Sequence, residues 1–188
     1  MSSNNLKTTI LAGGCFWCLE AVFEQVYGVK DVVSGYTGGN IADPSYESVC
    51  SGTTGHAEAV KISFDPNLIS FTVLLELFFV MHDPTTLNRQ GPDIGTQYRS
   101  AIFFNNLEQK NTAGQVINKL EESGVWENPI VTDIEPGMDF YDAEEYHQGY
   151  YRKNSNLAYC AIMISPKLAK LRKYYSNMLY RDISGQPI

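Results

Sequence analysis

Two cysteines, Cys15 and Cys18, flank the aromatic pair Phe16-Trp17 directly after Gly13-Gly14. The apolar residues that follow recur at helical spacing as far as Gly28, which puts the Cys15 thiol at the start of a helix. A helix N-terminus favours an anion through its free N–H groups and its dipole, and thiols there ionise more easily than free cysteine. The pattern therefore predicts a nucleophilic thiol at Cys15 with a lowered pKa.

Cys18 follows Cys15 by three residues, so both sulfurs face the same side of the first helical turn and could close a disulfide. Two further cysteines are Cys50, in a turn-rich segment, and Cys160, in an alternating apolar run. Four cysteines are too few for a disulfide framework, and a reducing compartment keeps them as thiols. The alternative for Cys15 and Cys18 is a role as small core residues, which is what we expect of Cys160.

Glu58 is the carboxylic acid whose position predicts a chemical role. In the expected strand 56–64 it has the same parity as Val60, Ile62 and Phe64, which puts its side chain on the apolar face. Burial raises the pKa of a carboxyl, and an acid that stays protonated near neutral pH can donate a proton during a reaction.

Cys15 and Cys18 could instead bind a metal ion. The three histidines, His56, His82 and His147, and the Glu144-x-x-His147 spacing could supply further ligands. A structural zinc site normally shows a second pair of closely spaced ligands, which this sequence lacks. We therefore expect no metal, and we expect the histidines to be buried, hydrogen-bonded residues near turns.

The elements that position these residues follow from hydrophobic periodicity and turn formers. Strands are expected at residues 8–12, 29–35, 56–64, 98–104, 130–134 and 159–164, and helices at residues 15–27, 70–81, 107–122, 142–150 and 168–179. The segments 36–55 and 88–97 are rich in turn formers and are expected to be mostly loop. Strands and helices interleave without strict alternation, which favours an α+β fold with a mixed β-sheet and packed helices.

Length and composition predict one catalytic domain over residues 1–188, with residues 1–7 and 181–188 as loose tails. The chain has 188 residues, of which 44% are hydrophobic. The net charge of -7 argues against binding to nucleic acid or to anionic membranes and favours a neutral or mildly basic partner. Because the sequence shows no signal peptide and no apolar run long enough to span a bilayer, we expect a cytoplasmic protein.

Six motifs, in the same order along the chain, resemble the type A peptide methionine sulfoxide reductases, which act on the S epimer. They are Gly13-Gly-Cys-Phe-Trp-Cys, Gly35-Tyr-Thr-Gly-Gly, Tyr46-x-x-Val-Cys-Ser-Gly-x-Thr-Gly-His-Ala-Glu58, His82-Asp-Pro-Thr, Asn88-Arg-Gln-Gly-x-Asp-x-Gly-Thr-Gln-Tyr-Arg-Ser100 and Glu145-Tyr-His-Gln. The resemblance implies a ferredoxin-like, two-layer sandwich around the mixed sheet. It also implies a monomer without a bound cofactor and thioredoxin as the external reductant.

By this resemblance, Cys15 is the nucleophile that attacks the sulfoxide sulfur. Phe16 and Trp17 form the apolar wall that holds the S-methyl group of the substrate, and Glu58 gives a proton to the sulfoxide oxygen. The residue patterns agree with these roles, since an aromatic face suits a sulfur-bound methyl group and a buried acid suits proton donation.

The resemblance assigns three further residues to the site. Tyr46 and Tyr98 correspond to the hydroxyls that hold the sulfoxide oxygen, and Asp93 corresponds to a carboxylate in the same polar network. Phenols can stabilise a developing oxyanion by hydrogen bonds without adding a second charge. For Asp93 the alternative is a role as a turn former beside glycine and proline.

The implied reaction reduces methionine sulfoxide, free or in proteins, to methionine and leaves a sulfenic acid on Cys15. A second thiol then forms a disulfide, which thioredoxin reduces. We expect Cys18 to be this resolving thiol, with Cys50 and Cys160 as alternatives, because the C-terminal tail carries the resolving cysteines in many relatives but has none here. Two other functional classes remain as alternatives. One is a general thiol–disulfide oxidoreductase, and the other is a non-catalytic module that binds methionine-containing partners.

Overall fold

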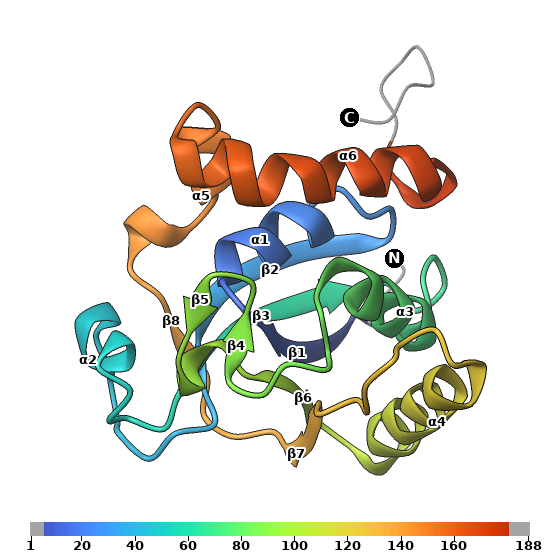
Figure 1. Ribbon diagram of the computed structural model, residues 1–188, viewed down its shortest axis with the longest axis horizontal. Helices are drawn as coiled ribbons and strands as arrows, with labels where there is room; N and C mark the ends of the chain where they lie inside the picture. The colour runs from blue at the N-terminus through green and yellow to red at the C-terminus, as the bar shows by residue number, and fades with distance from the viewer. Residues whose placement is uncertain (1–5, 181–188) are drawn as a thin grey trace, which may run out of the picture.

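The computed structural model describes residues 6–180 and has an α+β fold built on one mixed, six-stranded sheet (Figure 1). The strands are β1 (Lys7–Gly13), β2 (Val29–Thr37), β3 (Ala57–Phe64), β6 (Ser100–Phe104), β7 (Asp133–Pro136) and β8 (Tyr141–Asp142), in the order β7-β6-β1-β3-β2-β8. Only β6 and β7 pair in parallel. A separate hairpin joins β4 (Arg89–Gln90) to β5 (Asp93–Ile94).

Figure 1 shows one group of helices above the sheet and another at its lower right, with one short helix apart at the left. The helices are α1 (Phe16–Phe23), α2 (Tyr46–Cys50), α3 (Phe71–Met81), α4 (Leu107–Ser123), α5 (Tyr150–Asn154) and α6 (Ser165–Tyr174). A π-helix at Cys160–Ile164 precedes α6, and short 3-10 turns occur at Thr96–Tyr98, Glu145–His147 and Ser176–Met178. Helix α1 contacts β2 and β3 and also α5 and α6, whereas α3 and α4 pack against each other.

The four central strands form two interlocked crossovers. The segment β1-α1-β2 leaves a gap that β3 fills, and β3-α3-β6 leaves a gap that β1 fills, so every adjacent pair among these four strands is antiparallel. The end of β1 therefore lies beside the start of β3. This topology brings the start of α1 close to residue Glu58 on β3.

The two faces of the sheet differ in what they bury. Large residues such as Leu11, Val60 and Ile62 are fully buried in the main core beneath the helices. The other face carries a smaller cluster of buried residues, namely Ile10, Ala12, Ala57, Ala59, Ala101 and Phe103, with Phe140 packed on it. Because Glu58 shares the parity of Val60, its carboxyl lies on the helical side of the sheet.

Several predicted helix ends are confirmed by their caps. Ser70 begins α3, where its hydroxyl accepts a hydrogen bond from the N–H of Val73 at 3.3 Å. The amide oxygen of Asn106 accepts from the N–H of Gln109 at 2.9 Å at the start of α4. Gly124 ends α4 in the left-handed conformation, with φ of 64°.

Some predicted boundaries are wrong. Helix α1 stops at Phe23 rather than near Tyr27, because Val26 instead forms a bridge to Leu179. The segment 36–55, predicted to be mostly loop, contains α2, and the segment 88–97 contains the β4–β5 hairpin. The strand predicted at 130–134 is β7 at Asp133–Pro136, and the helix predicted at 142–150 is a 3-10 turn followed by α5.

The strand predicted at 159–164 is wrong, because this segment is a π-helix that runs into α6. In it Cys160 and Ile164 are buried, while Ile162 between them is 69% exposed. Alternation over so short an apolar run cannot separate a strand from one turn of helix. The burial predicted for Cys160 is nevertheless confirmed, at 0% exposure.

The predicted tails lie largely outside the described residues, which exclude 1–5 and 181–188. Lys7, expected in the N-terminal tail, is instead the first residue of β1 and pairs with Phe64. Among residues 6–180, no helix combines the length and the apolar character that a membrane crossing requires.

Candidate active site

The candidate site begins where β1 ends and α1 starts. Gly14 has φ of +90°, and a Cβ atom at this position would lie 2.5 Å from Cγ of Gln90, so only glycine fits here. Cys15 is the N-cap residue of α1, and its carbonyl accepts a hydrogen bond from the N–H of Cys18 at 3.1 Å. Both thiols are buried and reduced, and their sulfurs lie on the same side of this first turn.

The lowered pKa predicted for Cys15 is wrong for the free protein. Burial raises the pKa of Cys15 well above its ordinary value, and the hydrogen bond to Cys18 and the charge of Glu58 raise it further. The same hydrogen bond from Cys15 lowers the pKa of Cys18. With Cys15 only 7% exposed, desolvation of the thiolate outweighs the favourable end of the helix dipole. The resting Cys15 is therefore a protonated thiol that shares its proton with Cys18.

Glu58 lies beneath this turn with 1% exposure. Its carboxylate accepts a hydrogen bond from the N–H of Phe16 at 3.1 Å, which is one of the free N–H groups at the start of α1. Burial raises the pKa of Glu58 to about 8, although the hydrogen bond from Phe16 opposes the shift. The expectation of a buried carboxyl with a raised pKa is confirmed.

The aromatic pair after Cys15 is held rigidly. Phe16 is fully buried, and the indole of Trp17 stacks on Tyr150 with ring centroids 3.6 Å apart and planes 5° from parallel. The indole N–H of Trp17 donates to Nδ1 of His147 at 3.0 Å. The edge of Tyr159 meets the indole at 5.7 Å and 82°. These contacts fix Trp17 from three sides and leave it partly exposed next to Cys15.

Tyr46 reaches the site from the first turn of α2. Its ring centroid lies 4.5 Å from that of His147, and its N–H donates to Glu144 Oε1 at 2.9 Å. The other oxygen of Glu144 accepts from the hydroxyl of Tyr36 at 2.8 Å. Burial raises the pKa of Tyr46, as do its hydrogen bond to Cys50 and the charge of Glu58, so its phenol stays protonated.

Tyr98 and Asp93 come from the hairpin and the turn before β6. Burial raises the pKa of Tyr98, and the charge of Glu58 is the next largest cause. The Asp93 carboxylate accepts a hydrogen bond from the Tyr159 hydroxyl at 2.8 Å, and its charge raises the pKa of both Glu58 and Cys18. The fold therefore brings together around Glu58 residues from separate segments of the chain, namely Cys15, Phe16, Cys18, Tyr46, Asp93 and Tyr98.

The sequence reasoning missed four residues that surround Trp17 and Tyr46. These are Glu144, His147, Tyr150 and Tyr159, all from the segment between β8 and the π-helix. The Glu145-Tyr-His-Gln motif contains His147, which was expected to be only structural, and Glu144 was considered only as a possible metal ligand. Nothing in the local sequence marks Tyr159. Its hydroxyl bonds Asp93, and its own pKa is raised by burial and by the charge of Cys15.

The other two cysteines lie at different depths. Cys50 is half-buried at the end of α2, and burial raises its pKa. Cys160 is fully buried, and its pKa is raised by burial and then by the charge of Cys18.

No cluster of three metal-ligating side chains occurs within the described part of the chain. The histidines have other partners, as expected. Nδ1 of His56 accepts from the N–H of Gly39 at 3.1 Å, and the His82 ring lies 2.7 Å from both the Phe78 carbonyl and the Ser100 hydroxyl. All three histidines are buried.

Known proteins are similar to this chain in sequence and in fold. A peptide methionine sulfoxide reductase from Trichodesmium erythraeum is 55% identical over 174 residues, which cover 93% of this chain and 98% of the relative. The reduced form of Mxr1 from Saccharomyces cerevisiae is 38% identical, with a TM-score of 0.75 and coverage of 82% of this chain and 89% of that one. The same yeast protein in complex with Trx2 gives 28% identity and a TM-score of 0.53, with coverage of 79% and 87%.

The model of one protein family, described as peptide methionine sulfoxide reductase, matches residues 7–179. This span includes every residue of the candidate site, from Gly13 to Tyr159. The chain therefore belongs to the peptide methionine sulfoxide reductase family.

Proposed function

We propose that this chain reduces the S epimer of methionine sulfoxide, free or in proteins, to methionine, and that Cys15 is the nucleophile. The observation that carries the proposal is the pairing of a buried thiol with a carboxylic acid that is still protonated near neutral pH. The carboxyl group of Glu58 accepts a hydrogen bond from the backbone N–H of Phe16, and burial raises its pKa to about 8. Reduction of S=O consumes a proton on oxygen, and Glu58 is the acid that supplies it.

In the first step the sulfur of Cys15, after losing its proton, attacks the sulfoxide sulfur while Glu58 protonates the oxygen. The hydroxyl then passes to the Cys15 sulfur, and both the new bond between the two sulfurs and the S–O bond of the substrate break. Methionine leaves, and Cys15 is left as a sulfenic acid. The sulfoxide gains two electrons, and Cys15 loses two. Because Cys15 is protonated in the free protein, its proton must leave as its sulfur attacks, and the hydrogen bond to Cys18 supplies a path for that proton.

Substrate orientation rests on the aromatic and phenolic groups. Phe16 and Trp17 hold the S-methyl group, while the hydroxyls of Tyr46 and Tyr98 bond to the sulfoxide oxygen. Burial keeps both phenols protonated, which supports their role as donors. Asp93 acts from the same network by orienting the Tyr159 hydroxyl, to which it is bonded at 2.8 Å.

Recycling follows through a disulfide. The Cys18 thiolate attacks the sulfur of the sulfenic acid, water leaves, and a Cys15–Cys18 bond forms. Thioredoxin then reduces this bond with its own dithiol. The hydrogen bond between the two cysteines supports Cys18, and the existence of a yeast relative in complex with Trx2 supports thioredoxin as the partner.

The remaining expectations are part of the same proposal. The order β6-β1-β3-β2 with its two interlocked crossovers supports a ferredoxin-like, two-layer sandwich acting as one catalytic domain. We infer a monomer that needs no bound cofactor and binds neither nucleic acid nor membranes. Four free cysteines support a reducing compartment such as the cytoplasm.

A stoichiometry tests the proposal. The fully reduced protein is mixed with methionine-S-sulfoxide and, separately, with the R epimer, without any reductant, and methionine and lost thiols are counted per chain. We expect about one methionine and two lost thiols with the S epimer, and none with the R epimer. Cys15→Ser should form no methionine. If the parent forms none either, the reductase function is wrong.

The resolving thiol is tested in the same assay with Cys18→Ser, Cys50→Ser and Cys160→Ser. We expect only Cys18→Ser to stop after one thiol is lost, with a sulfenic acid that a dimedone probe captures. Loss of two thiols in Cys18→Ser would transfer the resolving role to Cys50 or Cys160, and a peptide map of the oxidised chain would identify which.

A further inference from the structure

We propose that the exposed edge of β2 and the acidic groove beside it form a second binding site, which captures extended, basic segments of protein substrates by adding them to the sheet as a strand. The inference rests on the proposed function and extends it, because it names the class of oxidised protein that the enzyme prefers. The site lies outside the catalytic pocket.

The edge of β2 is open at Val32. Strand β8 pairs with β2 only at Gly35 and Tyr36. At Ser34 the N–H donates to the side-chain oxygen of Gln148 at 3.0 Å, and the carbonyl accepts from the Gln148 amide and from the N–H of Ala143, both at 2.9 Å. At the start of β2 the Val29 carbonyl accepts a hydrogen bond from the Tyr180 hydroxyl. Backbone groups alternate in direction along a strand, so Val32 points its N–H and carbonyl to the same side as Ser34.

No hydrogen bond from a loop or side chain covers the outward backbone groups of Val32 in the part of the chain that the structure describes. An edge with unpaired N–H and carbonyl groups is a template for one more strand. The Gln148 amide already imitates such a strand at Ser34. An incoming peptide would continue its hydrogen-bonding pattern at Val32.

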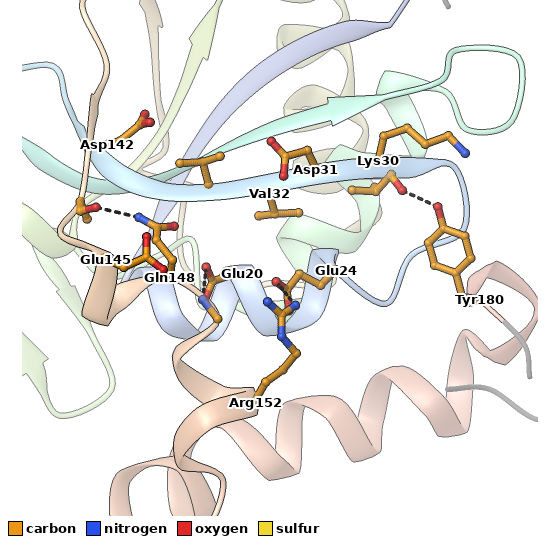
Figure 2. Close-up of a pocket in the computed structure, with 14 residues that line it drawn as sticks. Glu20, Glu24, Lys30, Asp31, Val32, Asp142, Glu145, Gln148, Arg152 and Tyr180 are labelled. Carbon is orange, nitrogen blue, oxygen red and sulfur yellow. Dashed lines mark hydrogen bonds and ion pairs between the residues drawn. The ribbon is translucent and has the colours of Figure 1, made fainter.

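A groove of about 620 Å³ runs along this edge (Figure 2). Its floor and far wall come from α1 and from the segment that leads into α5. Figure 2 shows the carboxylates of Glu20 and Glu24 between β2 and Arg152, those of Asp31 and Asp142 on the opposite side of β2, and Glu145 beside Gln148. This space is deep enough for the side chains on one face of an added strand.

The groove is acidic. Five carboxylates line it against two cations, Lys30 and Arg152. Two further cations, Lys61 and Lys153, pair with groove carboxylates from outside, but these are exposed contacts of 3.1 and 3.7 Å that contribute little. Asp31 has no ion-pair partner among residues 6–180. Lysine or arginine side chains of an added strand are the complementary charges.

The carboxylates in the groove also repel one another. Burial raises the pKa of Glu20, and the charge of Glu24 raises it further. The pKa of Glu24 is likewise raised by burial, and the charge of Asp31 adds to this against the opposing effect of Arg152. A bound cation would relieve this repulsion, which supports a basic occupant.

The groove and the catalytic pocket share a wall. Glu20 accepts hydrogen bonds from the N–H groups of Gly149 and Tyr150, and Tyr150 is the residue that stacks on Trp17. Along β2, Val32 and Tyr36 are four residues apart, or about 13 Å, and the Tyr36 ring lies 5.7 Å from that of Phe16. A chain held at the edge can therefore present a methionine sulfoxide to the pocket through a short linker.

The test uses peptides that carry one methionine-S-sulfoxide, a flexible Gly/Ser spacer of about eight residues that spans up to roughly 26 Å, and a five-residue segment. Three segments are compared: the basic Lys-Val-Lys-Val-Lys, the acidic Glu-Val-Glu-Val-Glu, and the basic segment with alternate backbone amides N-methylated. Each peptide is made with the segment before the sulfoxide and, separately, with the segment after it. N-Acetyl-methionine-S-sulfoxide amide serves as the substrate without a segment.

We expect KM for the basic peptide to be roughly tenfold below that for the acidic one in one chain order, with kcat unchanged. N-Methylation should remove most of this gain, because it blocks strand pairing but keeps the charges. The variant Asp31→Lys with Asp142→Lys should also remove it. Glu122→Lys with Glu127→Lys changes the net charge equally at exposed positions far from the groove in sequence, and should keep the preference.

Equal KM values for the basic, acidic and N-methylated peptides would overturn the inference while reduction of the short amide substrate still supports the function. A charge preference that N-methylation leaves intact would also overturn it, since the peptide would then bind without strand addition. The parent could also form a dimer that separates into monomers in the variant Asp31→Lys with Asp142→Lys. If the parent then shows no preference among the peptides, the occupant of the groove is a second copy of the chain. Failure to reduce the short substrate would reject the proposed function itself.

Discussion

At the scale of single residues, burial decides the protonation state of the two groups that we propose start the reaction. Cys15 and Glu58 both lie beneath the first turn of α1, where the helix dipole and free N–H groups favour anions. Desolvation is the larger effect for both, so both pKa values are raised. The resting site is therefore a neutral pair of acids.

Glu58→Gln should lower kcat by about 10²- to 10⁴-fold, because glutamine fills the same space but cannot release a proton. It should also change how stability depends on pH. The folded pKa of Glu58, about 8, exceeds its ordinary value of 4.5, so between these values the folded state holds a proton that the unfolded state has lost. Rising pH therefore destabilises the parent by up to about 1.4 kcal/mol per pH unit through this group, and the variant lacks that loss.

Urea unfolding of both proteins at several pH values from about 5 to about 8 measures this effect. The free energy of unfolding of Glu58→Gln should gain on that of the parent as pH rises. Glu127→Gln, at an exposed position, serves as the control and should follow the parent. Stability curves of parent and Glu58→Gln that run parallel over this range would contradict a buried, protonated Glu58.

At the scale of elements, the site depends on the junction between β1 and α1. Gly14 adopts a conformation that other residues rarely adopt, and it lets the Gln90 side chain lie against the turn. The Gln90 amide oxygen accepts from the N–H of Asp83 at 3.1 Å, and Gln90 pairs with Asp93 in the hairpin. The position of Asp93 is therefore tied to the turn that carries Cys15.

Gly14→Ala should destabilise the fold by at least about 1–2 kcal/mol, because of its positive φ and the clash with Gln90. It should also lower kcat/KM, since the hairpin that carries Asp93 must shift. The control is Gly114→Ala in α4, where a Cβ meets nothing within 4 Å. That change should stabilise the protein by about 0.5–1 kcal/mol and leave kcat/KM unchanged. Urea unfolding and steady-state kinetics of both variants test these expectations. Equal free energies of unfolding for Gly14→Ala and Gly114→Ala would show that Gly14 is not required by its conformation.

At the scale of the whole molecule, one core supports both the fold and the site. Cys15, Phe16 and Cys18 belong to the same buried cluster as residues of α3, α6 and the sheet. The segment that holds Trp17 in place is also tied to α1 through Glu20. Loss of packing anywhere in this cluster should therefore dismantle the site.

Unfolding should be a single transition in which the site and the rest of the core are lost together. The two tryptophans report on it separately, since Trp17 lies in the site and Trp126 lies near the end of α4. Fluorescence of Trp17→Phe and of Trp126→Phe during urea unfolding should give transitions that coincide with the loss of far-UV circular dichroism in each variant. Two separated transitions would show that the site forms an independent unit.

The sequence by itself determined the chemistry-bearing residues and most elements of the fold. Cys15, Glu58 and the strands around them follow from local spacing, because period-2 and helical patterns report which side of an element is buried. Caps such as Ser70 and Asn106 also act locally, between residues three positions apart. These features need no knowledge of distant segments.

Only the tertiary structure decided the protonation state of Cys15 and the shape of the site around it. Its pKa depends on how much water distant segments exclude, which overrides the local effect of the helix start. The contacts of Tyr159 with Asp93 and with Trp17 join residues that local spacing cannot relate. The run 159–164 is a π-helix rather than a strand because packing buries Cys160 and Ile164 on one face. The burial of a side chain usually depends on several elements that pack together. Local sequence patterns therefore predict burial only where the face of a single element determines it.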